Sequence, residues 1–225
     1  IAIKYKNDSL NYKELMHSTH IIASSIYALG SDQKQVAFFL KFGIQQFAGI
    51  LGILRAGCAY VPIDTSWPAH RIEFSIKDSE SAAVITDNEN IGQIRALAGN
   101  RPVINIDEIN FDAKQDTEIP LPGPDTIMHI LYTSGSTGEP KGVYTTHRNQ
   151  LHFIKRLSEY IELGPEDNFA YYFSIGFSAH ALPFLGALLN GGTLLMYNLP
   201  KDCFPALAEF FNDESSTYSL MIRSV

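Results

Sequence analysis

One short loop of this chain carries the residue types that bind phosphate groups. Residues 131–143 read LYTSGSTGEPKGV, so glycines, hydroxyls and one lysine lie between two short apolar runs. Glycine lets backbone N–H groups converge on an anion without a Cβ in the way, hydroxyls add donors, and lysine adds positive charge. The residues with these properties are Thr133, Ser134, Gly135, Ser136, Thr137, Gly138 and Lys141. We therefore expect a strand, a loop that holds a polyphosphate, and a second strand.

Two other interpretations of this loop compete with that expectation. The Walker loop has the pattern Gly-x-x-x-x-Gly-Lys-Ser/Thr. Here Glu139 and Pro140 separate Gly138 from Lys141, so a Walker-type ATPase is disfavoured. A solvated Ser/Gly hinge with a chance lysine is the plain structural alternative. It would be favoured for a Ser/Thr/Gly run alone, so the choice depends on the rest of the chain.

The elements around the loop alternate between strands and helices. Asn11 and Glu14, three residues apart, resemble a capping box at a helix start. Apolar patterning predicts strands over residues 1–5, 36–40, 60–63, 82–86, 102–106, 127–131, 143–145, 169–173, 193–197 and 218–222. It predicts helices over residues 11–29, 43–55, 68–77, 147–161, 179–189 and 205–211. This alternation predicts an α/β fold with a mostly parallel sheet.

Composition limits the class of protein. Of the 225 residues, 45% are apolar and 18% are charged, which is enough to bury a core. The net charge of −7 argues against nucleic acid or an anionic membrane surface as a partner. Because no apolar run is long enough for a membrane span, we expect none. Cys58 and Cys203 have no CxxC or His-rich neighbour, so we expect no metal site and a reducing, cytoplasmic location.

Three further stretches match one enzyme family in the family's own order. Residues 10–15 read LNYKEL, residues 54–64 read LRAGCAYVPID, and residues 185–192 read LGALLNGG. Together with the loop, they resemble the adenylate-forming (AMP-binding) enzymes, and most closely the adenylation domains of nonribosomal peptide synthetases. In the second stretch Cys58 replaces the family's usual glycine. The Tyr-Val-Pro-Ile-Asp version of this stretch is typical of the peptide-synthetase branch, and the resemblance covers essentially the whole chain.

The resemblance implies a fold and a boundary. It predicts an α/β architecture with two mostly parallel sheets flanked by helices, so that residues 1–225 form a partial N-terminal AMP-binding domain. Residues 42–157 are expected to build one sheet with the phosphate loop, and residues 1–40 plus 158–225 the other. The chain has no initial Met and opens inside a predicted strand, so we expect a piece of a longer chain, with the family's C-terminal domain absent.

The resemblance also implies a reaction. A substrate carboxylate attacks the α-phosphate of ATP, which gives an acyl-adenylate and pyrophosphate, and a thiol then takes the acyl group. No protein nucleophile is needed because the carboxylate is ionised near neutral pH. The loop residues would hold the β- and γ-phosphates, and Lys141 would offset developing charge. The implied cofactors are ATP, Mg²⁺ and a phosphopantetheine or CoA thiol; the implied partners are a small carboxylic acid and a carrier-protein domain.

The implied acyl pocket differs from that of amino-acid-activating relatives. Their pattern is Phe-Asp-x-Ser, and the match places Phe177 on the Phe and Ser178 on the Asp. The family's Asp holds the substrate's α-ammonium ion, and a buried ammonium without a counter-ion is costly. We therefore expect an aryl, hydroxy, keto or fatty acid, or a β-amino acid held elsewhere. A register error of one or two residues is the alternative.

The length of the chain limits what it does alone. The family's adenine- and ribose-binding motifs and its late catalytic lysine would lie beyond Val225, so we expect weak or no ATP binding and no turnover. We also expect an exposed apolar sheet edge and some association. The alternative from another class is a non-catalytic truncated remnant or binding module. Coding sequence beyond Val225 would distinguish the two.

Overall fold

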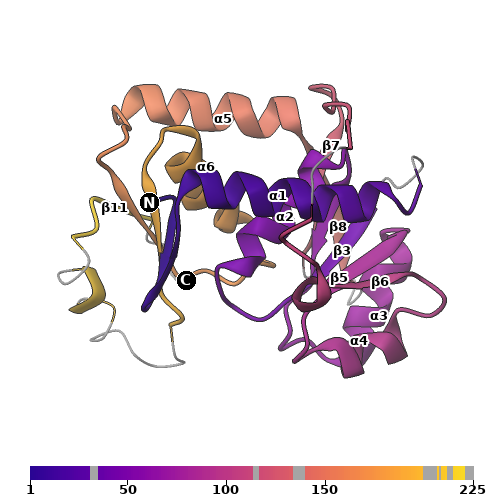
Figure 1. The fold of residues 1–225 in the computed structure, drawn as a ribbon. Coiled ribbons are helices and arrows are strands. Elements are labelled where there is room, and N and C mark those ends of the chain that lie inside the picture. The colour runs from indigo at the N-terminus through magenta and orange to yellow at the C-terminus, as the bar shows by residue number, and fades with distance from the viewer. Residues whose placement is uncertain are drawn as a thin grey trace. The chain divides into compact units, whose positions relative to one another are not determined.

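Two compact α/β units make up the chain. The computed structural model describes residues 1–30, 35–113, 117–133, 140–199, 207, 209–211 and 215–220. One unit comprises Ile1–Leu15 with Leu151–Val225, and the other comprises Met16–Gln150. Helices and strands alternate along the chain, and Figure 1 traces this order. The predicted α/β class with two mostly parallel sheets is confirmed.

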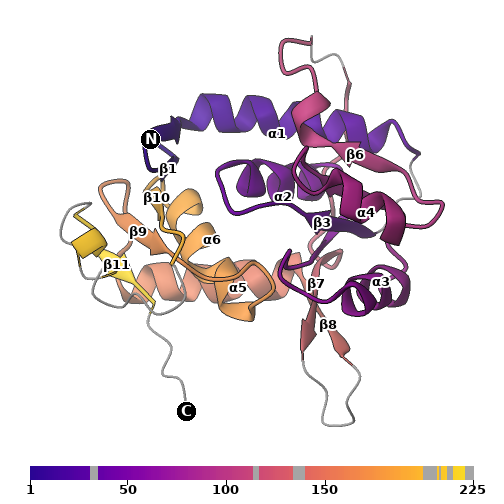
Figure 2. The same ribbon diagram turned by 90° about the horizontal axis from the view of Figure 1, so that it is seen from below.

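The unit Met16–Gln150 contains a six-stranded sheet. In spatial order its strands are β6 (Val103–Asn105), β5 (Ala83–Thr86), β3 (Gln35–Phe39), β4 (Ala59–Pro62), β7 (Ile127–Thr133) and β8 (Lys141–Thr146). The pairs are parallel except β7 with β8, which form an antiparallel hairpin that Figure 2 shows clearly. Strands β4 and β5 are buried at every position, as expected of parallel strands that are covered on both faces.

Helices cover both faces of this sheet. On one face, Ala37 and Phe39 of β3 cluster with α3 (Ala69–Asp78) and α4 (Ile91–Leu97). On the other face, Phe38 lies against α2 (Gln45–Arg55) at Gly49, where a Cβ would come 2.8 Å from the phenyl ring. Alternate residues of one strand therefore anchor opposite helix layers.

A further helix packs on α2. In α1 (Tyr12–Tyr27), Ile22 is fully buried and lies so close to Gly52 of α2 that a Cβ there would be 2.4 Å from Ile22 Cγ2. The order α1, α2, β3, α3 is visible in Figure 2. The predicted cap of α1 is confirmed: Glu14 N donates to Asn11 Oδ1 at 2.9 Å, and Asn11 N donates to Glu14 Oε2 at 2.8 Å.

The other unit contains a five-stranded sheet. Its order is β11 (Tyr218–Ser219), β9 (Asn168–Tyr171), β10 (Thr193–Met196), β1 (Ile3–Tyr5) and β2 (Asp8–Leu10). Only β1 with β2 is antiparallel among the described pairs. Helix α6 (Ala181–Leu189) packs on β9 and β10. Helix α5 (His147–Tyr160) begins in the unit Met16–Gln150 and ends in this one. Among the described residues, none of the helices is both long and apolar enough to cross a membrane.

One predicted boundary is wrong. The resemblance predicts that residues 1–40, which include β3, belong to the same sheet as β1, but β3 pairs in parallel with β4 and β5. Its apolar residues are buried on both faces, so it is an interior strand of the six-stranded sheet. The change of sheet therefore comes before β3. Strand β2 and the short helix α4 were not predicted.

Candidate functional site

The two stems of the predicted phosphate loop form the end of the β7–β8 hairpin. Thr133 is the last residue of β7, Lys141 is the first of β8, and the two pair in register. Thr133 Oγ1 donates to Lys141 O at a long 3.5 Å. Both Thr133 and Lys141, which we call the two stem residues of the loop, are exposed. The two strands predicted on either side of the loop are thus confirmed.

The remaining loop residues lie outside the described part of the chain. They are Ser134, Gly135, Ser136, Thr137 and Gly138. Their role in holding phosphate stays a prediction. The structure brings Thr133 and Lys141, eight residues apart, to adjacent positions, so that both ends of the loop start from one hairpin.

A buried tyrosine lies directly before the loop. Tyr132 is 3% exposed, and its hydroxyl donates to Asp78 Oδ2 at 2.7 Å. Burial raises the pKa of the Tyr132 phenol, and the hydrogen bond to the Asp78 carboxylate raises it further, so the phenol keeps its proton. This contact ties the strand that enters the loop to the end of α3.

The far side of the hairpin is fixed at the start of α5. His147 N donates to Thr126 O at 3.1 Å, and Arg148 N donates to Pro124 O at 2.7 Å. The Arg148 guanidinium also makes two hydrogen bonds to the Asp125 carboxylate, at 2.7 and 3.0 Å, and this pairing lowers the pKa of Asp125. Partial burial lowers the pKa of His147, which is the first residue of α5.

The predicted acyl-pocket residues lie in the unit that comprises Ile1–Leu15 and Leu151–Val225. Phe177 is 45% exposed and stacks on Phe173, with ring centroids 6.3 Å apart. It precedes a short 3-10 helix, η2 (Ser178–His180). The side chain of Ser178 is outside the described part, so its match to the family's Asp stays a prediction.

A buried histidine two residues beyond Ser178 was missed from the sequence. His180 is fully buried, and its Nδ1 lies 2.7 Å from Phe177 O, which can only accept, so Nδ1 carries the proton. Burial lowers the pKa of His180 to about 4, although the hydrogen bond to Phe177 opposes this shift. The imidazole is therefore neutral at pH 7 and holds the backbone turn at Phe177. The one sequence signal was a lone histidine at the head of an apolar helix.

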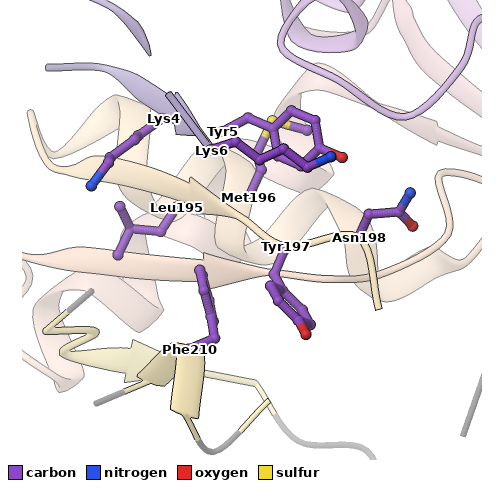
Figure 3. A pocket seen from close by; sticks show the side chains of 8 residues that line it. All are labelled: Lys4, Tyr5, Lys6, Leu195, Met196, Tyr197, Asn198 and Phe210. Carbon is purple, nitrogen blue, oxygen red and sulfur yellow. The ribbon is translucent and has the colours of Figure 1, made fainter. Parts of the chain in front are cut away.

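A cavity of about 510 Å³ lies at the carboxyl ends of β1 and β10, and none of the predicted site residues lines it (Figure 3). Lys4 pairs in register with Leu195, and Tyr5 pairs with Met196, so these two pairs project from opposite faces of the sheet. Figure 3 shows the two sets of side chains on either side of the β10 ribbon. The cavity therefore lies around the ends of two neighbouring strands and is lined from both faces of the sheet, and we assign it no ligand.

Comparison with known proteins decides the family. Residues 1–221 match the model of the AMP-binding enzymes. The chain belongs to this family. It is 32% identical over 222 residues to surfactin synthase subunit 2 of Bacillus subtilis (strain 168), which covers 96% of the chain and 6% of that protein. It is 33% identical over 204 residues to bacitracin synthase 2 of Bacillus licheniformis, covering 89% and 8% respectively. The chain thus spans less than a tenth of these curated relatives.

Solved structures share the fold of this chain. The nonribosomal peptide synthetase FmoA3, bound to alpha-methyl-L-serine-AMP, superposes with a TM-score of 0.87 at 26% identity, over 96% of this chain and 24% of that one. FmoA3 is also solved with AMPPNP bound. The N-terminal subdomain of NpsA from Klebsiella oxytoca, in complex with 3-hydroxybenzoyl-AMSN, superposes with a TM-score of 0.84 at 22% identity, over 98% and 55% of the two chains.

Proposed function

We propose that the protein carrying this chain activates a carboxylic acid with ATP and then passes the acyl group to a thiol. One observation carries this proposal: in a chain of the AMP-binding family, Thr133 and Lys141 pair at the end of a hairpin, at the two ends of a Ser/Thr/Gly loop. The AMPPNP-bound structure of FmoA3 supports ATP as the co-substrate. We expect the protein in the cytoplasm, with a carrier-protein domain or CoA as the source of the thiol.

The chemistry needs positioning more than it needs a protein nucleophile. An oxygen of the substrate carboxylate attacks the α-phosphorus, the bond from that phosphorus to the bridging oxygen breaks, and pyrophosphate leaves with the electron pair. A thiolate then attacks the acyl carbonyl carbon and AMP leaves. In this proposal the backbone and hydroxyls of residues 133–138 hold the departing phosphates, and Lys141 offsets the negative charge that develops on them.

We propose that magnesium reaches this site bound to the phosphates of ATP. Mg²⁺ at nucleotide sites is usually bound by substrate phosphates and waters with one or two carboxylates, and not by a cage of protein ligands. Among the described residues, no group of three or more His, Cys, Asp or Glu side chains is placed to hold a metal. We propose that the ion arrives with ATP, and we assign it no protein ligand.

The substrate proposal follows from Ser178. FmoA3 binds an amino-acyl adenylate, whereas a serine at the matching position of this chain offers no negative charge to an α-ammonium ion. Phe177 would line the pocket beside it. We propose an aryl, hydroxy, keto or fatty acid, or a β-amino acid whose ammonium is held elsewhere, as the substrate class.

ATP–pyrophosphate exchange with the protein that carries this chain tests both parts. We expect label to enter ATP when an aryl, hydroxy, keto, fatty or β-amino acid is supplied, and background exchange with the common L-α-amino acids. Efficient exchange with those amino acids would overturn the substrate proposal alone. Background exchange with every acid class would overturn the enzyme proposal. The 225-residue chain alone is expected to bind magnesium ATP weakly and not to turn over.

A further inference from the structure

The residue that enters the phosphate loop is held by a helix from elsewhere in the sequence. The Tyr132 hydroxyl donates to Asp78 Oδ2 at 2.7 Å, and its ring meets Phe74 edge-on, with centroids 6.2 Å apart and an interplanar angle of 81°. Phe74 and Asp78 are one turn apart on α3, so they lie on the same face of that helix. Helix α3 therefore contacts the tyrosine at two points, one apolar and one charged.

The same ring also supports the strand that leaves the loop. Gly142 pairs with Tyr132 across the hairpin, and a Cβ on Gly142 would lie 3.4 Å from Tyr132 Cζ and 3.1 Å from Ile130 Cγ2. The 3.1 Å separation from Ile130 is tighter than most Cβ contacts, whereas 3.4 Å from the Tyr132 ring is ordinary van der Waals contact. Glycine therefore lets β8 lie close to Ile130 and beside the Tyr132 ring. Tyr132 is thus in contact with α3 on one side and with the residue next to Lys141 on the other.

This arrangement matters for a loop that must hold a polyanion. Ordering backbone groups around a ligand costs conformational entropy, and a preorganised stem lowers that cost. Removing Asp78 would leave the hydroxyl of a buried tyrosine without its acceptor, which is more costly than removing both partners together. The contact between residues 54 apart in sequence is therefore placed to set the position of both loop stems.

We propose that Tyr132, anchored by Asp78, is a positioning residue for the phosphate loop, and that it presents Thr133 and Lys141 to the phosphates of ATP. This inference rests on the proposed function for its ligand. It makes no use of Tyr132 as a catalytic residue, because the side chain is buried and points at α3 rather than at the loop.

The test uses the 225-residue chain and five variants. Tyr132→Phe removes the hydroxyl and keeps the ring on Gly142. Asp78→Ala removes the acceptor, Asp78→Asn keeps an acceptor oxygen, and a fourth variant combines Tyr132→Phe with Asp78→Ala. Tyr144→Phe is the matched control, because Tyr144 lies two residues beyond Gly142 on the same strand and is 66% exposed. Amide hydrogen exchange of residues 127–146 and NMR titration with magnesium ATP are measured for each protein.

We expect Tyr132→Phe and Asp78→Ala each to weaken magnesium ATP binding about three- to tenfold and to speed exchange at the paired ends of β7 and β8 by a similar factor. The double variant should lose no more than either single one, because both act through one hydrogen bond. Asp78→Asn should restore most of the affinity, and Tyr144→Phe should match the wild type. Exchange in β3 and β5 should stay unchanged, which a general loss of stability would not allow.

The outcomes separate the two proposals. If wild-type protein shows no response to magnesium ATP but Tyr132→Phe alone loosens the hairpin ends, nucleotide binding by the chain fails and the positioning role stands. If Tyr132→Phe leaves both exchange and binding at wild-type values, or if Tyr144→Phe loses as much, the positioning inference is overturned.

Discussion

Protonation of His180 should set the acid stability of the unit that carries Phe177. The folded-state pKa of His180 is about 4, against an ordinary value of 6.5, because the ring is fully buried. A histidine with a lowered pKa binds its proton more tightly in the unfolded chain. Its contribution to stability is therefore complete above pH 6.5 and is lost as the pH falls from 6.5 toward 4. The whole shift corresponds to about 3 kcal/mol at 1.36 kcal/mol per pKa unit, of which about 2 kcal/mol is lost by pH 5.

The perturbation is His180→Gln, which keeps an amide donor for Phe177 O and does not titrate. Native-state hydrogen exchange of the β9 and β10 amides is the assay, because the single tryptophan, Trp67, lies in the other unit. Wild-type protein should lose about 2 kcal/mol in these strands between pH 7 and pH 5, and the variant much less. His152→Gln, on the exposed face of α5, is the control and should keep the wild-type slope. If His180→Gln keeps the full wild-type slope, the neutral buried histidine is not the cause.

Three further predictions concern close packing and hydrogen bonds. Gly52→Ala should destabilise the six-stranded unit by about 1–3 kcal/mol in a urea titration followed by Trp67 fluorescence, because its Cβ would overlap Ile22. The control Gly92→Ala, in α4 with open space around it, should be neutral or stabilising in the same titration. Equal losses of stability in the two variants would contradict the close packing of Gly52 on Ile22. Tyr12→Phe should cost about 1 kcal/mol in β10 exchange, since its hydroxyl donates to Gly192 O at 2.7 Å, and an unchanged value would show that this hydrogen bond adds no net stability. Gly142→Ala should weaken magnesium ATP binding at least about threefold, because the new Cβ would crowd Ile130 and shift the start of β8. Wild-type affinity in this variant would argue against close packing at this end of the hairpin.

Local patterns predicted much of the fold. Helix α1 and its Asn11/Glu14 cap, the short buried strands and the two stems of the loop all depend on spacing within a few residues, which the sequence displays directly. The seven-residue helix α4 was missed because its short length shows little periodicity, and only one of its residues, Ile94, is buried.

Tertiary relations were beyond that kind of prediction. The sheet to which β3 belongs depends on its pairing with β4 and β5, and either sheet would accept a short apolar strand. The burial of His180 and the contact of Tyr132 with Asp78 depend on residues that meet only after folding. The chemistry of the loop could be predicted because its glycine, hydroxyl and lysine residues lie within nine positions of the sequence. The residues that hold the loop in place, such as Tyr132 and Asp78, are far apart in the sequence.

Titration of magnesium ATP into the labelled 225-residue chain, followed at the amides of Thr133 and Lys141, tests the central claim most directly. We expect saturable shifts at these two residues with a dissociation constant of about 1 mM or weaker. The shifts should be lost in Lys141→Ala, while Lys155→Ala, exposed on α5, should behave as wild type. Shifts at the ends of β1 and β10 instead, or an unchanged response in Lys141→Ala, would contradict a phosphate-binding loop at residues 133–141.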